Sequence, residues 1–172
     1  AMTEGVVGEL QQGSATVFVL SNGTWTEQAT LVHSNGGANE YFGGAVAVSE
    51  DGNTVVVGTI NNNVGKGSVA VFTRTDGTWT EQQILTKSDA GGDMFGESVA
   101  LSADGNTGTV GAMTEGVVGE LQQGSATVFT RNGGTGAGQV ILSQSNGAGN
   151  DWFGISVGLS DDGTVARVGA HR

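Results

Sequence analysis

The side chains best suited to chemistry in this sequence are carboxylates that recur in similar short segments. Asp51, Asp104 and Asp162 each follow a serine by two residues and stand immediately before a glycine. Carboxylate oxygens in close spacing are what calcium binds in proteins. Aspartate and glycine are also typical of tight turns, in which the carboxylate accepts backbone hydrogen bonds. We therefore expect these three residues to shape turns between strands, and they are also the candidate calcium ligands of the chain.

Catalytic constellations are harder to find. The two histidines, His33 and His171, stand outside any triad or metal-ligand spacing. The absence of cysteine excludes a thiolate metal site and a cysteine nucleophile. We expect a protein that is not an enzyme. An enzyme acting on a polysaccharide stays open as the alternative, because carboxylates distant in the chain can converge in the fold.

The charge balance of the 172 residues limits the partners. With 17 acidic against 6 basic side chains the net charge is −11, which argues against nucleic acid, since phosphate binding needs clustered lysine and arginine. The apolar runs are also far shorter than a membrane-spanning helix requires. We expect neither nucleic-acid binding nor membrane insertion.

Internal repetition is the strongest feature of the sequence. Phe-Gly pairs recur at residues 42, 95 and 153, and Gly-Ser pairs at residues 13, 67 and 124, so two independent markers report one period of about 55 residues. Each Phe-Gly is followed by a similar segment: AVAVSEDGNTVVVGT, SVALSADGNTGTVGA and SVGLSDDGTVARVGA. The chain is therefore built from copies of one structural unit.

Each unit has the periodicity of strands, not of helices. Ser98 to Leu101 and Thr109 to Ala112 predict two strands around a tight turn, and Ser125 to Thr130 predicts a third. Thr78 to Leu85, after the Asp76-Gly77 turn, shows the fourth in the middle unit. The sequence thus predicts an all-β protein of four-stranded antiparallel sheets. One such sheet cannot cover both of its own faces, so neighbouring sheets must pack against it.

The ordered motifs resemble those of the FG-GAP repeat family. Phe-Gly at the start of the first strand, Val-Gly-Ala or Val-Gly-Thr at the end of the second and Gly-Ser before the third occur in the same order in all three units. These are the β-propeller repeats also found in the heads of integrin α subunits, and the GSAxVF and GTWTxQ segments are most similar to the bacterial and algal variety. The resemblance implies a β-propeller, a structural or interaction role such as cell adhesion, and an extracellular or cell-surface location.

The same resemblance bears on calcium. Integrin-type repeats often carry a calcium loop between their first two strands, with an alternating DxDxDG pattern. The segments around Asp51, Asp104 and Asp162 are short and lack that pattern. We therefore expect no metal or other cofactor, and these three aspartates remain weak calcium candidates.

The phase of the repeats predicts a single repeat domain over residues 1–172, with about three blades per chain. We expect a half-blade (strands three and four) at 1–33, whole blades at 42–87 and 95–143, and a half-blade (strands one and two) at 153–172. Terminal half-blades close many propellers by strand exchange, but three blades are too few for a ring. We therefore expect a homo-oligomer, most simply a dimer with six blades, while an open fibre-like array or a fragment of a longer repeat protein stays open.

Large side chains next to the Phe-Gly pairs are the candidate ligand-binding residues. Tyr41, Met94 and Trp152 share the position immediately before Phe-Gly, where they either pack between blades or contact a protein or glycan at the rim. The acidic residues just before them, Glu40, Asp93 and Asp151, are expected to accept backbone hydrogen bonds in the connections between blades. The expected core phenylalanines are Phe18, Phe42, Phe72, Phe95, Phe129 and Phe153, and Trp25 and Trp79 are expected to cover blade faces.

One further observation concerns origin. Residues 1–18 and 112–129 are identical, loop included. Loops normally diverge fastest, so the identity indicates recent duplication or an engineered copy. An engineered propeller with no ligand of its own is therefore a further alternative.

Overall fold

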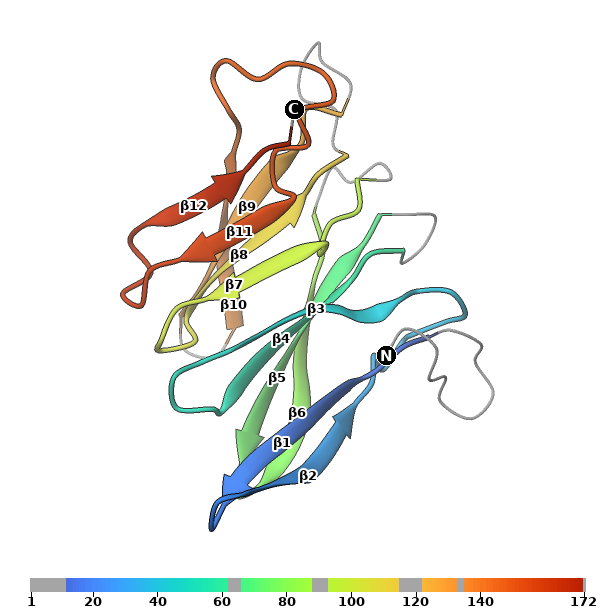
Figure 1. Cartoon of the computed structure of the whole chain (residues 1–172), viewed down its shortest axis with the longest axis vertical. Helices are drawn as coiled ribbons and strands as arrows, with labels where there is room; N and C mark the ends of the chain where they lie inside the picture. Colours follow the sequence, from blue (N-terminus) through green and yellow to red (C-terminus); the bar gives the residue numbers. More distant parts are fainter. Residues whose placement is uncertain (1–11, 62–65, 88–92, 115–121, 133–134, 172) are drawn as a thin grey trace.

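A computed structural model describes residues 12–61, 66–87, 93–114, 122–132 and 135–171 of the chain. All regular structure in these residues is β-strand (Figure 1). The strands form four antiparallel sheets, two of four strands and two of two. This confirms the prediction of an all-β protein with four-stranded antiparallel sheets.

The two four-stranded sheets have the order expected for consecutive hairpins. One contains β3 (Phe42–Val48), β4 (Thr54–Thr59), β5 (Ser68–Thr75) and β6 (Thr78–Leu85). The other contains β7 (Ser98–Leu101), β8 (Thr107–Ala112), β9 (Ser125–Asn132) and β10 (Thr135–Leu142). Each strand pairs with the next one along the chain.

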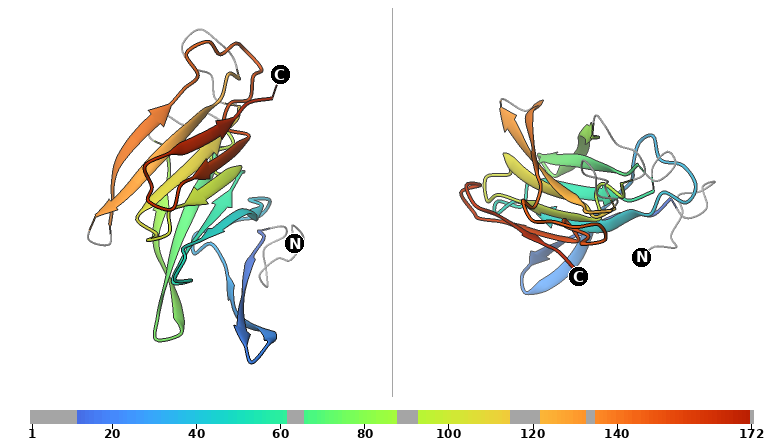
Figure 2. Two further views of the ribbon diagram at one scale, coloured as in Figure 1. Left: turned by 60° about the vertical axis from the view of Figure 1, so that its left-hand side comes forward. Right: turned by 90° about the horizontal axis from the view of Figure 1, so that it is seen from above.

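The two-stranded sheets lie at the two ends of the row. They are the β1–β2 sheet, made of β1 (Ala15–Ser21) and β2 (Thr24–Leu31), and the β11–β12 sheet, made of β11 (Ser156–Leu159) and β12 (Ala166–Gly169). Figures 1 and 2 show the four sheets side by side in chain order, from β1–β2 (blue) to β11–β12 (red). Residues 1–11 and 172, included in the predicted half-blades, lie outside the described residues.

The hairpins follow from the residues at their turns. Asn22 and Gly23, between β1 and β2, have φ angles of 51° and 78°, and Asp76 and Gly77, between β5 and β6, have 50° and 81°. Two successive residues with positive φ form the turn whose twist matches that of paired strands. The sequence pairs Asn-Gly and Asp-Gly therefore fix both hairpins.

The core lies between neighbouring sheets and not within any one of them. One buried cluster joins the faces of the two four-stranded sheets, with Val56 and Val71 on one side and Val110 and Phe129 on the other. A second cluster joins the β1–β2 sheet to the β3–β6 sheet. All six residues of β4 are buried, because this strand has a sheet neighbour on each side and a packed layer on each face.

Each Phe-Gly pair connects one sheet to the sheet before it. Phe42 forms an isolated parallel bridge with Gly13, as Phe95 does with Gly67 and Phe153 with Gly124. Beyond these bridges, β3 packs against β7, and β7 against β11 (Figure 1). The Phe-Gly and Gly-Ser motifs thus mark the joints between repeats.

Two predicted core positions are wrong. Four of the six phenylalanines are buried, but Phe153 is half-buried and Phe18 is 53% exposed. Trp25, expected to cover a sheet, is 65% exposed, whereas Trp79 packs against the second buried cluster. The equivalent residues of the next sheet, Phe72 and Trp79, pack against the β1–β2 sheet that precedes them. Phe18 and Trp25 belong to the first sheet in the described residues, where no preceding sheet covers them.

Candidate functional site

The turn aspartates are held by hydrogen bonds within their own turns. In the turn between β3 and β4, one carboxylate oxygen of Asp51 accepts from the Ser49 hydroxyl at 2.6 Å and from the Asn53 backbone N–H at 2.9 Å. Asp104 receives the same pair of bonds at 2.7 and 2.9 Å, and Asp162 receives them at 2.5 and 3.0 Å. The serine two residues earlier is thus the residue that orients each carboxylate.

These bonds stabilise the ionised carboxylates. The serine hydroxyl first, and the backbone N–H second, lower the pKa of Asp104 and of Asp162 to about 2. The same donors lower the pKa of Asp51. The aspartates are therefore charged over the whole range in which the protein is normally handled, and their charge is used in the turn.

Among the residues that the structure describes, no group of three or more histidine, aspartate or glutamate side chains is arranged to hold a metal ion. Calcium requires several oxygens converging on one point, whereas the aspartate before each turn glycine is already bound to the serine and backbone of its own turn. The geometry assigns Asp51, Asp104 and Asp162 a structural part in the turns.

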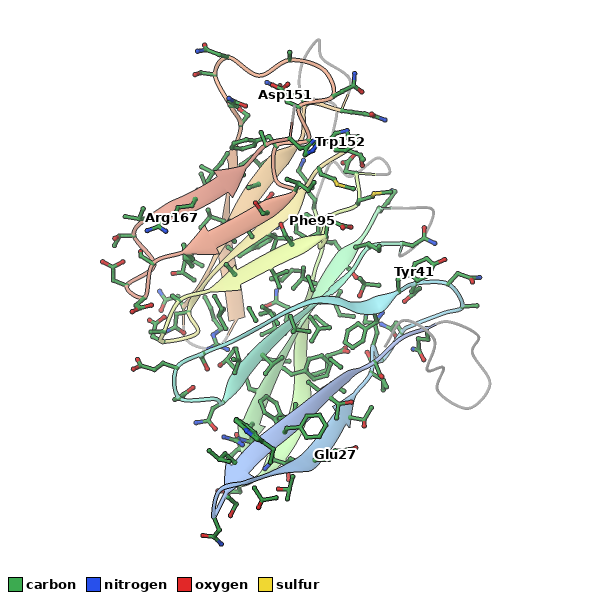
Figure 3. The ribbon with its side chains drawn as sticks, in the orientation of Figure 1. Glu27, Tyr41, Phe95, Asp151, Trp152 and Arg167 are labelled. Atoms are coloured by element: carbon green, nitrogen blue, oxygen red, sulfur yellow. The ribbon has the colours of Figure 1, made fainter. Side chains whose placement is uncertain are left out.

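The three candidate ligand-binding residues before the Phe-Gly pairs, here called the rim residues, share an unusual backbone conformation. Tyr41, Met94 and Trp152 have φ angles of 56°, 53° and 49°, in the left-handed region that side-chain-bearing residues rarely adopt. Each stands at the start of its sheet's first strand, at the end opposite the aspartate turns, as the labels of Tyr41 and Trp152 show in Figure 3. A strained backbone repeated at one position points to a common requirement there.

The side chains at this position are partly accessible. Met94 is 37% exposed, and Tyr41 and Trp152 are half-buried. The Trp152 ring stacks on His171 with centroids 5.7 Å apart, and its indole N–H has no partner in the described part of the chain. The structure does not bring the three side chains into one cluster, because each belongs to a different sheet. They share only their position in the repeat, just before the Phe-Gly pair.

The acidic residues beside the rim are buried and serve the connections. The Asp151 carboxylate accepts the Ala148 N–H at 2.8 Å, as predicted. Glu40 instead lies 3.1 Å from the ring nitrogen Nδ1 of His33. His33 is 3% exposed and stacks on Phe42, so it is a structural residue of the joint between β2 and β3. In the sequence this pair is only a glutamate seven residues after a histidine, and that spacing is too common to predict a contact.

A groove beside β1 is a further candidate site, and no motif in the sequence marks the residues that line it as a binding site. It has a volume of about 500 Å³ and lies between β1 and β3, where it is lined by Ala15, Val17, Phe18, Leu31, Val46 and Val48, among others. Val46 and Val48, on β3, are 57% and 60% exposed. The groove therefore presents an apolar surface together with an edge of β1 that has no partner strand in the described residues, which is the combination that another strand would cover.

Comparison with known proteins agrees with the repeat pattern. The model of the FG-GAP repeat matches the chain twice, at residues 25–72 and 79–129. No curated protein matches it in a sequence search. In the described residues no helix is long and apolar enough to cross a membrane.

Proposed function

The chain belongs to the FG-GAP repeat family, and on that premise we propose that it is a non-enzymatic β-propeller interaction module that assembles with copies of itself. In this proposal the β1–β2 and β11–β12 sheets are half-blades, and each is completed by the other half-blade of a neighbouring copy. FG-GAP repeats are typical of extracellular or surface proteins, and we place this module in that setting.

The observation that carries the proposal is the complementarity of the two half-blades. By sequence repeat, β1 and β2 correspond to β5 and β6, the third and fourth strands of a whole sheet. By the same repeat, β11 and β12 correspond to β3 and β4, the first and second strands. Each half-blade therefore supplies what the other lacks. Two copies joined in this way would form a ring of six blades, within the usual range for propellers.

The rim is the surface that we propose for a ligand. Tyr41, Met94 and Trp152 present large, partly exposed side chains on strained backbone, and amphipathic aromatic rings suit contacts with sugars and proteins. A protein or a glycan is the proposed ligand class. Binding to a glycan array without breakdown of the bound glycan would support this role, and hydrolysis would favour the polysaccharide-acting alternative.

Solution mass by light scattering tests the assembly. The chain has a mass of 17.2 kDa, so the proposal predicts a discrete species of twice that mass. A ladder of larger species would favour an open array. A single chain at all concentrations would contradict self-assembly, and it would favour a fragment whose neighbouring repeats lie elsewhere in a longer protein.

A further inference from the structure

The joint between whole sheets contains a backbone contact that leaves no room for a side chain. The carbonyl of Gly96, which opens one sheet, lies against Gly58 at the end of β4 in the sheet before it, and the carbonyl of Gly154 lies in the same way against Gly111 of β8. The Ser98 hydroxyl donates to the Gly154 carbonyl at 2.8 Å. The glycine near the end of the second strand is therefore required by the sheet that follows.

Gly169 is the third glycine of this series, and its contact is missing. It occupies in β12 the place of Gly58 and Gly111, but a side chain added there would meet only Ser156, and no backbone from a following sheet. The corresponding partner is Gly43. Gly43 lies against the Ser14 carbonyl but lacks the second-strand N–H that Gly154 contacts at Ala112. Gly169 and Gly43 thus each lack the contact that Gly111 and Gly154 make with each other.

The turns between first and second strands show the same continuity. The Glu50 N–H donates to the Ala103 carbonyl at 3.0 Å, and the Ala103 N–H donates to the Asp161 carbonyl at 2.9 Å. These bonds link three successive sheets in one direction. The next bond of the series would run from the Asp161 N–H to a Glu50 carbonyl, which in this chain lies in the β3–β4 turn, two sheets away.

The outer strands repeat the pattern again. The Glu81 carboxylate on β6 accepts bonds from the N–H and hydroxyl of Ser34, which follows the outer strand of the preceding sheet. Glu27 holds the place of Glu81 in β2, and Ser145 holds the place of Ser34 after β10. Ser145 is exposed, and it follows the outer strand of the second four-stranded sheet, whereas Glu27 lies in the β1–β2 sheet. Three series of contacts between sheets, at the glycines, at the turns and at the outer strands, are therefore interrupted at the same two places. These places lie beside β1–β3 and beside β10–β12.

From this continuity we propose that a second copy of the chain occupies the groove beside β1, with its β12 paired antiparallel to β1 and Val168 opposite Thr16. The register follows from the two whole sheets, where Val57 pairs with Ala70 and Val110 with Thr127. In this register the Ser156 hydroxyl donates to the Gly43 carbonyl, the Asp161 N–H to the Glu50 carbonyl, and Ser145 to Glu27, each pair spanning two copies. The inference rests on the proposed self-assembly and specifies its interface.

Disulfide formation between single-cysteine variants tests the register, because the chain has no cysteine of its own. Thr16→Cys chains are mixed with Val168→Cys chains under oxidised glutathione, and covalent dimers are measured on a denaturing gel. Directly opposed residues on paired strands have their Cβ atoms about 5 Å apart, close to the spacing a disulfide needs. The matched control replaces Val168→Cys by Arg167→Cys, which in the proposed register points to the opposite face of the sheet.

The proposal predicts that the Thr16 and Val168 variants give at least tenfold more covalent dimer than the control mixture or either variant alone. Light scattering of each variant accompanies the gel. A mass of two chains together with preferential linkage to Arg167→Cys would overturn the register while leaving self-assembly intact. A mass of one chain without linkage in any mixture would overturn both. If a variant is not folded by circular dichroism, the opposed pair Phe18→Cys and Ala166→Cys replaces it, because Val55 pairs with Phe72 and Gly108 with Phe129 in the whole sheets.

Discussion

The chain contains one segment twice, and the two copies have different surroundings. Residues 12–18 and 123–129 are identical in sequence. In the second copy Thr127 is 0% and Phe129 is 5% exposed, whereas in the first Phe18 is 53% exposed and Thr16 is also exposed. The strand pairing is the same in both copies, since β1 pairs antiparallel with β2 as β9 does with β10.

The difference comes entirely from neighbours. β9 lies between β8 and β10 in its sheet, and its Phe129 packs in one buried cluster with Val56 and Val71 of the sheet before it. β1 has β2 on one edge and, within the described residues, no strand on the other. In the described residues no sheet precedes the β1–β2 sheet either, so a segment suited to a buried strand is left partly exposed.

The largest expected contrast is between two equivalent phenylalanines. Phe129→Ala is expected to lower the free energy of unfolding by about 3–5 kcal/mol, because it empties a packed site. Phe18→Ala is expected to cost less than about 1 kcal/mol at dilutions where the chains are single, since half of that ring is already in water. Urea unfolding followed by tryptophan fluorescence measures both. Equal losses in dilute solution would mean that Phe18 is buried within one chain.

The next contrast uses the glycines of the joint. Gly111→Ala is expected to destabilise the single chain, because the added methyl group collides with the Gly154 backbone. Gly169→Ala meets only the Ser156 side chain in one copy, so it should leave the unfolding of a single chain nearly unchanged. Between copies it should raise the dimer Kd about tenfold or more, measured by sedimentation. An unchanged Kd would remove Gly169 from the interface.

Replacing Arg167 is expected to strengthen the association between copies. It holds in β12 the place of Val56 in β4, which is 6% exposed in the layer between sheets. An arginine in such a layer loses solvation without gaining packing. Arg167→Val is therefore expected to lower the dimer Kd several-fold, while Arg167→Lys should not. Weaker association of the valine variant would show that the guanidinium itself makes a contact across the interface.

The smallest expected effect concerns pH. Because folding lowers the pKa of Asp104 to about 2, its contribution to stability is fully present above the unfolded value, about 4, and is lost as pH falls toward 2. Asp104→Asn should therefore flatten the stability profile only between about pH 4 and pH 2. Chemical unfolding at a series of pH values measures this, and a difference between the profiles that changes above pH 5 would be inconsistent with the lowered pKa.

Much of the fold could be predicted because its signals are local. The Asp76-Gly77 turn, the alternating residues of β6 and the strand at Ser98–Leu101 all follow from neighbouring residues in the sequence. The hydrogen bonds of Asp51 also follow from turn preferences. The periodicity then identified the repeats, and the family model confirms them.

What could not be predicted depends on contacts between distant segments or on backbone strain. The exposure of Phe18 depends on packing between sheets, which buries the equivalent Phe72 and Phe129 and which the sequence of β1 does not encode. The buried pair of His33 and Glu40 forms only when the connection folds back on itself. The left-handed backbone of Trp152 contradicts its residue type, so no propensity would have indicated it.

The central claim is that each half-blade is completed by another copy. Sedimentation velocity of the unmodified chain and of the Val168→Asp variant tests this claim most directly. We predict a species of twice 17.2 kDa for the unmodified chain at micromolar concentration. Val168→Asp should sediment as a single folded chain, because a carboxylate at this position of β12 would be buried without a partner. A single 17.2 kDa species for the unmodified chain at every concentration would contradict the claim.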